Sequence, residues 1–195
     1  MMIKVYFDFL CPFCYLGRGF WLKMQEERPV EAEWVPWEIH PEYPPEGGAA
    51  KSDAKAEADL KRYRALGGEL RPFEATHVSP NTRNALMGLE FARAAGRTDA
   101  YIERVFQAIF VEDKNVSSVE AVVELGSEVG LDGEALGRSL REGKYGEILA
   151  ERDREAEGMG LEVVPSFVQD GNLVLAGSTT MNFEEFRSKY LAVWG

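Results

Sequence analysis

Cys11 and Cys14 are the residues best suited to chemistry, and they are the only cysteines in this chain of 195 residues. Pro12 and Phe13 separate them, and a mostly apolar stretch over residues 3–9 comes just before. That stretch predicts a buried strand, and proline is common at the first position of a helix, so a helix is expected to begin at Pro12. A helix N-terminus stabilises a thiolate and lowers the pKa of a thiol placed there. The pair therefore predicts a reactive Cys11 with a second thiol close enough to form a disulfide with it.

Other uses of a Cys-x-x-Cys pair lead to different expectations. Covalent haem attachment is excluded because Tyr15, rather than histidine, follows Cys14. A zinc site needs further ligands, but the chain has no second such pair, and His40 and His77 lack the close spacing of a zinc finger. No metal site is therefore expected, and both histidines are interpreted as hydrogen-bonding residues of loops. One structural alternative stays open, in which the cysteines pack as small hydrophobic residues.

Composition and charge limit the partners of the chain. Its 33 acidic and 22 basic residues give a net charge of −11, which disfavours binding to nucleic acids and to anionic membranes. No stretch is long and apolar enough for a membrane helix, and the first residues do not resemble a signal peptide. We therefore expect a soluble cytoplasmic protein. In that reducing compartment, a disulfide that forms and breaks is a better interpretation than a permanent cross-link.

The two ends of the chain carry the strand signals. Near the N-terminus, a central strand over residues 3–9 and an edge strand over 31–39 flank a helix expected from Pro12 to about residue 27, and Pro36 places the second strand at a sheet edge. Near the C-terminus, a charged helix precedes two apolar runs that are joined by Asp-Gly, a strong signal of a hairpin, and a final helix follows.

Residues 52–143 show helical periodicity and no strand signal. Asn81 is expected to cap one of these helices, and a capping box is expected at residues 117–120. The order of elements is thus β-α-β, a helical insertion, and α-β-β-α. We predict an α/β fold in which residues 1–50 and 144–195 form one unit and residues 51–143 form an inserted, all-helical subdomain.

This order of elements, with Cys-x-x-Cys at the start of the first helix and Val164-Pro165 before the hairpin, resembles the DsbA-like branch of the thioredoxin superfamily. Residues 8–17, 36–41 and 164–167 are similar to the corresponding motifs of cytoplasmic FrnE-like oxidoreductases. The same branch includes glutathione-dependent 2-hydroxychromene-2-carboxylate isomerases, which generally carry serine at the position matching Cys11 and lack the second cysteine. The two intact cysteines here therefore favour redox chemistry.

The resemblance implies a thioredoxin fold and a role for each site residue. Cys11 would be the exposed, attacking thiolate, and Cys14 would resolve the mixed disulfide. Pro165 would follow a cis peptide bond, and the Val164 backbone would pair with an extended substrate, which Pro12 and Phe13 would also contact. The partners would be protein thiols and disulfides or small thiols. No cofactor is implied beyond the cysteine pair, with glutathione as a possible co-substrate.

Two positions depart from the family pattern. Strongly oxidising periplasmic members carry histidine where this chain has Phe13, so this pair is expected to be less oxidising. In much of the superfamily a buried acidic residue assists proton transfer, and its position is occupied here by Val5. Asp8 and Glu38 are candidate substitutes, and the sequence leaves the choice open.

Two alternative functions stay open at this level. One is a glutathione-dependent isomerase or transferase, which would need Cys11 but not Cys14. The other is a non-enzymatic binding or holdase module that uses an apolar groove and needs neither cysteine. The expected assembly is a monomer or a homodimer.

Overall fold

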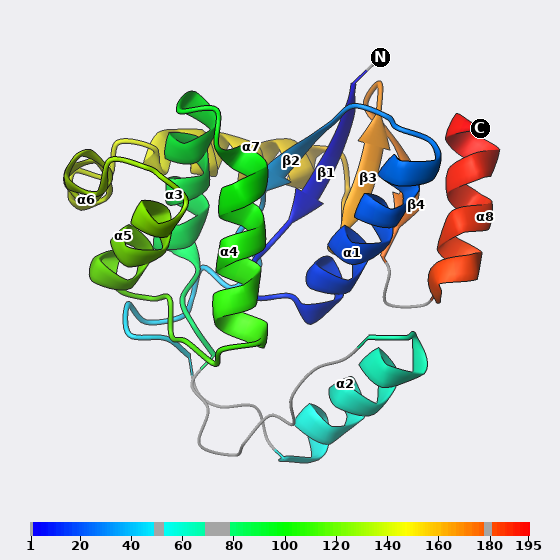
Figure 1. Ribbon diagram of the computed structural model, residues 1–195, viewed down its shortest axis with the longest axis horizontal. Coiled ribbons are helices and arrows are strands. Elements are labelled where there is room, and N and C mark those ends of the chain that lie inside the picture. The colour runs from blue at the N-terminus through cyan, green and yellow to red at the C-terminus, as the bar shows by residue number, and fades with distance from the viewer. Residues whose placement is uncertain (1, 49–52, 69–78, 178–180) are drawn as a thin grey trace.

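The computed structural model describes residues 2–48, 53–68, 79–177 and 181–195. Within these residues the chain forms a four-stranded sheet that is covered by helices (Figure 1). The elements, in chain order, are β1 (Ile3–Phe7), α1 (Pro12–Glu27), β2 (Ala32–Pro36), α2 (Asp53–Ala65), α3 (Arg83–Ala94), α4 (Thr98–Phe110), α5 (Val119–Glu128), α6 (Gly133–Arg141), α7 (Gly146–Gly158), β3 (Ser166–Gln169), β4 (Asn172–Ala176) and α8 (Phe183–Trp194). The predicted α/β class and the order β-α-β, helices, α-β-β-α are confirmed. None of the described helices is both long and apolar enough to cross a membrane.

The sheet has the strand order β2-β1-β3-β4. β1 pairs in parallel with β2 and antiparallel with β3, and β4 pairs antiparallel with β3. The first strand is central, as predicted, although it ends at Phe7. Pro36 ends the edge strand β2, as expected for a residue without a backbone N–H. Asp170 and Gly171, with φ of 50° and 77°, form the predicted tight turn between β3 and β4.

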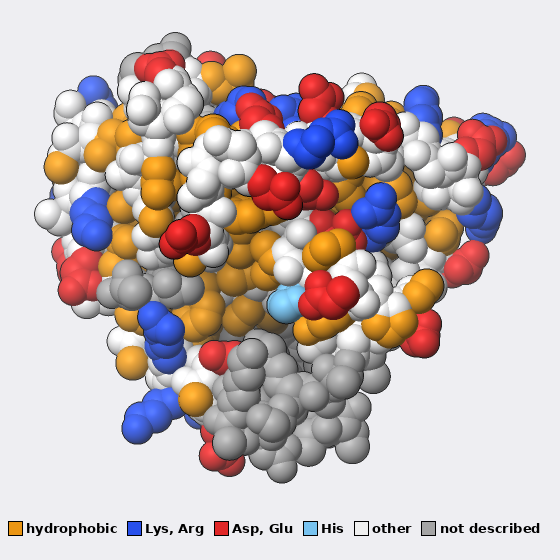
Figure 2. Space-filling view, turned by 180° about the vertical axis from the view of Figure 1, so that it is seen from behind, with side chains coloured by type: hydrophobic (Ala, Val, Ile, Leu, Met, Phe, Trp, Pro, Cys, Tyr) orange, Lys and Arg blue, Asp and Glu red, His pale blue; other side chains and the backbone are white. Residues whose placement is uncertain are grey.

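The two faces of the sheet pack against different helices, because successive side chains of a strand point to opposite sides. On one face, Phe167 of β3 packs against Trp21 of α1 and Phe186 of α8. On the other face, Tyr6 of β1 packs with Ala156 of α7 in a smaller core. Figure 1 shows α7 behind the sheet, and Figure 2 views the molecule from that side.

Aromatic side chains join the helical segment to the end of β1. The ring centroid of Phe106 on α4 lies 5.8 Å from that of Phe7 and 5.1 Å from that of Phe9. Tyr101, also on α4, lies 6.2 Å from Phe9. Phe9 belongs to the turn that leads from β1 to Cys11, so this cluster helps to position the cysteine pair.

Helices α3 to α6 pack on one another, and α3 also contacts α7. The described part of the segment between β2 and α7 is helical apart from its turns, loops and an isolated bridge between Gly48 and Ser79. The division into a unit of residues 1–50 and 144–195 and an inserted unit of residues 51–143 stays a prediction. Part of that segment, including residues 69–78, lies outside the described residues.

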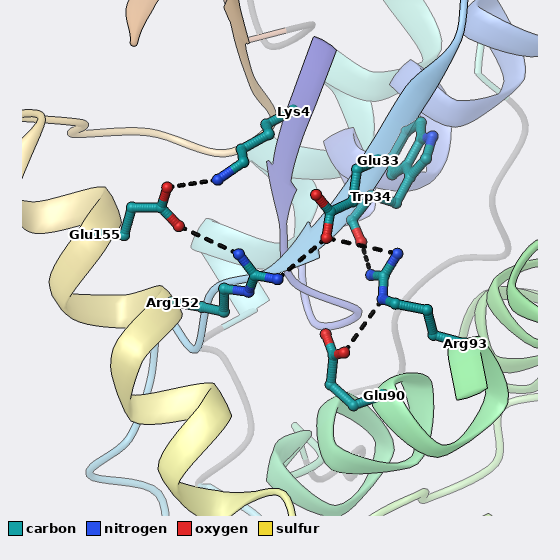
Figure 3. A network of polar contacts seen from close by, with 7 residues as sticks. All are labelled: Lys4, Glu33, Trp34, Glu90, Arg93, Arg152 and Glu155. Carbon is teal, nitrogen blue, oxygen red and sulfur yellow. Dashed lines mark hydrogen bonds and ion pairs between the residues drawn. The ribbon is translucent and has the colours of Figure 1, made fainter. Parts of the chain in front are cut away.

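A network of charged side chains fastens α7 and α3 to the sheet (Figure 3). Arg152 of α7 donates to Glu33 of β2 at 3.1 Å, and Arg93 of α3 donates to the carbonyl oxygen of Trp34 at 2.6 Å. The other members of the network are Lys4, Glu90 and Glu155. The network sets the position of α7, whose C-terminal end borders the candidate site.

One predicted helix cap is confirmed by its side-chain contact and the other is wrong by one residue. The N-cap position of α3 is Thr82, whose hydroxyl group donates to Asp8, but the side chain of Asn81 caps the helix as predicted, because it accepts from the N–H of Arg83 at 3.0 Å. The capping box predicted at residues 117–120 is replaced by a cap from Ser118 on α5.

Candidate active site

The turn after β1 places Cys11 and Cys14 at the start of α1. Cys11 is the N-cap of the helix, with φ of −86° and ψ of 112°, and Pro12 occupies the first helical position as predicted. The backbone N–H of Cys11 donates to the carbonyl oxygen of Asp8 at 3.2 Å, which closes the turn. The N–H of Cys14 donates to the carbonyl oxygen of Cys11 at 3.0 Å. Both cysteines are free thiols in this structure.

The two thiols differ in burial. Cys11 is 9% exposed and Cys14 is fully buried, so Cys11 is the more accessible of the two. The resemblance implies an openly exposed Cys11, and the structure corrects this expectation. Helix α2 lies over this end of α1 (Figure 1), where the ring of Tyr63 is 6.0 Å from that of Phe13 and the Arg62 guanidinium is 5.6 Å from the same ring.

Leu60 and Tyr63 of α2 were not among the predicted site residues. The available signal was the pair Leu60 and Tyr63, two apolar residues at helical spacing in an otherwise polar segment, and both are buried. That spacing indicates one packed helix face but does not say against what it packs. Their partner lies across the chain, at the start of α1.

The surroundings of the pair shift the two pKa values in opposite directions. The pKa of Cys11 is lowered, mainly because the Cys14 thiol donates a hydrogen bond to its thiolate, and the backbone N–H groups of Cys14 and Phe13 add to this effect. Burial and the negative charge of Asp8 oppose the shift. The pKa of Cys14 is raised, first by burial and then by its interaction with Cys11. Cys11 is therefore the more acidic thiol of the reduced pair.

The Cys14→Ala variant is expected to raise the pKa of Cys11. The substitution removes the thiol hydrogen bond that contributes most to stabilising the Cys11 thiolate, so more alkaline conditions are needed to ionise it. Thiolate absorbance at about 240 nm, followed as a function of pH, measures this shift. Cys14→Ser keeps a hydroxyl donor and serves as the matched control, with a smaller rise. An unchanged titration in Cys14→Ala would contradict the assigned hydrogen bond.

The same pKa shift makes the stability of the reduced protein depend on pH. Because the pKa of Cys11 is lower in the folded than in the unfolded chain, the stabilisation is present above the unfolded value of about 8.5. It is lost as the pH falls through the folded pKa. The wild-type protein should show this dependence in unfolding experiments, and Cys11→Ala should not.

The segment before β3 brings Val164 and Pro165 to the cysteine pair. The Val164–Pro165 peptide bond is cis, the isomer that the resemblance implies. The Cys11 Sγ atom lies 3.8 Å from the carbonyl oxygen of Val164. The carbonyl oxygen of Pro165 accepts from the N–H of Gly177 at 2.7 Å, which ties the segment to the end of β4. The structure thus brings Cys11, Cys14, Pro12, Phe13, Val164 and Pro165 into one site.

Asp8 organises the turn beneath the cysteines. It is fully buried, and its carboxylate accepts three hydrogen bonds, from Leu10 N–H at 3.0 Å, Ile39 N–H at 2.9 Å and the Thr82 hydroxyl at 2.6 Å. Burial raises the pKa of Asp8, and these hydrogen bonds oppose the rise. A single carboxylate therefore connects the β1 turn, the segment after β2 and the start of α3.

Glu38 has a different environment from Asp8. Arg83 donates to its carboxylate at 2.5 Å, and burial raises its pKa despite this cation. The negative charge of Asp8 acts to raise the pKa of both cysteines. Of the two acidic residues that the sequence suggests in place of Val5, Asp8 is the one coupled to the thiols.

The remaining candidates lie outside the pair. His40 forms a hydrogen bond with Glu42 at 2.7 Å and stacks on Tyr43, which agrees with its interpretation as a loop residue. His77 lies outside the described residues. In the part of the chain that the structure describes, no three His, Cys, Asp or Glu side chains are grouped as a metal site would require.

Comparison with known proteins adds a family and a fold. A family model described as DSBA-like thioredoxin domain matches residues 2–190. The protein YwbO of Bacillus subtilis (strain 168) is 31% identical over 181 residues, which is 90% of each chain.

Solved structures share the fold at low sequence identity. A probable DsbA oxidoreductase, SCO1869 from Streptomyces coelicolor, is 22% identical with a TM-score of 0.81, covering 99% of this chain and 90% of its own. The cytosolic disulfide reductase DsbM from Pseudomonas aeruginosa, solved with GSH, is 16% identical with a TM-score of 0.74 and coverage of 99% and 98%. A 2-hydroxychromene-2-carboxylate isomerase is 20% identical with a TM-score of 0.73 and coverage of 99% and 94%.

Proposed function

Because the chain belongs to the DSBA-like thioredoxin domain family, we propose that it is a thiol–disulfide oxidoreductase that cycles a Cys11–Cys14 disulfide. The observation that carries this proposal is the environment of the two thiols. Cys11 is the more accessible, its pKa is lowered, and Cys14 lies buried beside it with a raised pKa. These are the properties of an attacking thiolate and a resolving thiol.

The proposed reduction has two exchange steps. The Cys11 thiolate attacks one sulfur of a partner disulfide, which forms a mixed disulfide and releases the other partner sulfur as a thiolate that takes up a proton. Cys14 then loses its proton and attacks the Cys11 sulfur, which breaks the mixed disulfide and releases the second partner thiol. The cysteine pair gives up two electrons and the partner disulfide gains them. Oxidation of a dithiol partner is the same sequence in reverse.

Other features of the proposal follow from this chemistry. The partners are protein thiols and disulfides or small thiols, with glutathione as a candidate co-substrate, and no cofactor is required because the pair itself carries the electrons. Phe13 adds no charge beside Cys11, so we propose a less oxidising pair than one with histidine at that position. We place the protein in the cytoplasm, as a monomer or a homodimer, and away from membranes and nucleic acids.

Equilibration with glutathione redox buffers tests the proposal. The protein should pass from dithiol to disulfide as one two-electron transition. In such a transition the ratio of the two forms changes tenfold for each change of about 30 mV in the buffer potential. Mass spectrometry after acid quenching and alkylation measures the two forms. Cys11→Ala and Cys14→Ala should show no such transition. A wild-type pair that never forms the intramolecular disulfide would exclude this function.

A second function is favoured by the similarity to 2-hydroxychromene-2-carboxylate isomerase. In a glutathione-dependent isomerase or transferase, Cys11 would act on a bound thiol without any need for a resolving cysteine. Turnover of an isomerase substrate that survives in Cys14→Ala would therefore favour this alternative. Loss of this turnover in Cys14→Ala as well as in Cys11→Ala would show that both cysteines are needed, which favours the oxidoreductase.

A further inference from the structure

An open groove of about 470 Å³ lies between the segment that follows β2 and the residues from the end of α7 to Val164. It is lined by Trp37, Glu38, Ile39, Pro41, Glu157, Glu162, Val163 and Val164. Val164 belongs to this groove and also holds the carbonyl oxygen that lies 3.8 Å from Cys11 Sγ. Val164 therefore connects the groove to Cys11, although neither cysteine lines the groove itself. Figure 2 shows this face, on which hydrophobic side chains gather near the centre with acidic side chains around them.

The lining combines apolar surface with negative charge. Trp37 and Ile39 are half-buried and Val163 is 44% exposed, so they offer apolar contact area to a partner. Glu157 and Glu162 are exposed, and neither forms an ion pair with another described residue. Among the described lining residues none is lysine or arginine.

The positive charge of Arg83 does not neutralise the carboxylates of the groove. Arg83 pairs with Glu38 at 2.5 Å, so its charge offsets one carboxylate. Asp153, which accepts from the backbone N–H of Glu38 at 3.0 Å, is a further acidic group behind the lining, and burial, followed by the charges of Asp8 and Glu157, raises its pKa. The groove therefore has an excess of negative charge around an apolar floor.

We propose that this groove selects cationic partners, namely protein segments in which lysine or arginine and an apolar residue lie close to the reacting cysteine. This inference rests on the proposed disulfide exchange and names its substrate class. Glu162 lies two residues before Val164, so about 7 Å of extended backbone at most separates them. A substrate chain that pairs with the Val164 backbone places a basic side chain, about two residues from its cysteine, beside Glu162 and Glu157. Glutathione carries a net negative charge and is disfavoured by the same carboxylates.

Matched peptide disulfides test this selectivity. Three peptides of the same length and apolar content carry lysine, glutamine or glutamate two residues from the half-cystine, and oxidised glutathione is the fourth substrate. The second-order rate constant for reduction by the reduced protein should follow the order Lys, Gln, Glu. The span should be about tenfold at low ionic strength and should shrink strongly at about 0.5 M salt. Oxidised glutathione should react more slowly than the lysine peptide.

A charge-matched pair of variants separates the groove from the net charge of the chain. Glu157→Gln/Glu162→Gln should reduce the Lys-to-Glu rate ratio to about threefold or less. Glu120→Gln/Glu134→Gln changes the net charge equally at side chains on α5 and α6 that are 75% and 90% exposed, and should leave the ratio unchanged. Equal rates for the lysine and glutamate peptides, or an equal loss of selectivity in both variants, would overturn the inference while leaving the proposed function intact. Failure of the wild-type protein to reduce the glutamine peptide faster than Cys11→Ala does would overturn both.

Discussion

Replacing Cys14 with alanine is expected to make the protein retain its substrates as mixed disulfides. The Cys11 thiolate can still attack a partner disulfide, but the covalent intermediate has lost the intramolecular thiol that resolves it. Cys11 and Cys14 are the only cysteines of the chain, so no third thiol can replace Cys14. Mixed disulfides should accumulate on Cys14→Ala and should be released by an added thiol reductant.

The Cys11→Ala variant is the control for this experiment. It lacks the attacking sulfur, so it should form almost no mixed disulfide, and its rate of disulfide reduction should fall by about a thousandfold or more. Non-reducing electrophoresis with mass mapping of the linked peptide identifies the sulfur that carries the partner. Linkage through Cys14 in the wild-type protein would reverse the assigned roles. Equal capture by both single variants would show that the pair does not act as an attacking and a resolving thiol.

Asp8→Ala is expected to destabilise the reduced protein by about 3–5 kcal/mol, since it leaves buried donors without their acceptor. Those donors are Leu10 N–H, Ile39 N–H and the Thr82 hydroxyl, and they come from three different segments. Urea unfolding at neutral pH measures the loss. Thr82→Val removes only one of the three interactions and should lower the free energy of unfolding by about 1–2 kcal/mol. Equal effects of the two variants would show that the backbone donors do not depend on Asp8.

The charge of Asp8 gives a second readout at the cysteines. Asp8→Asn nearly preserves the size of the side chain but removes a negative charge that opposes ionisation of Cys11, so the pKa of Cys11 should fall. A purely structural role for Asp8 would leave that titration unchanged in any variant that stays folded.

The pH dependence of stability follows from the raised pKa of Asp8. Protonation is easier in the folded chain than in the unfolded chain, so the stabilisation is complete below the unfolded pKa of about 3.9 and is lost as the pH rises through the folded value. Asp8→Asn should lack this loss. Comparing the two proteins from acidic to neutral pH isolates the contribution of Asp8 from those of the other carboxylates.

Local sequence rules determined the elements that carry the cysteine pair. Pro12 at the first helical position and Arg28-Pro29 after the last turn set the limits of α1, which match the prediction. Asp170-Gly171 specified the hairpin because both residues adopt positive φ readily. In each case the deciding interaction lies within a few residues along the chain, so composition and spacing are enough to predict it.

Only the tertiary structure decided what surrounds the pair. The Val164 carbonyl oxygen meets Cys11 across 153 residues of sequence, and Thr82 reaches Asp8 across 74. Likewise, Tyr63 packs against Phe13, next to Cys11, which is only 9% exposed. Such contacts depend on how a whole core packs, because a hydroxyl, a carbonyl or an aromatic ring has the same local preferences whichever distant partner it meets. The sequence therefore identified the cysteine pair, whereas packing between distant segments set the access of the two thiols, their charge environment and the acidic groove next to Val164.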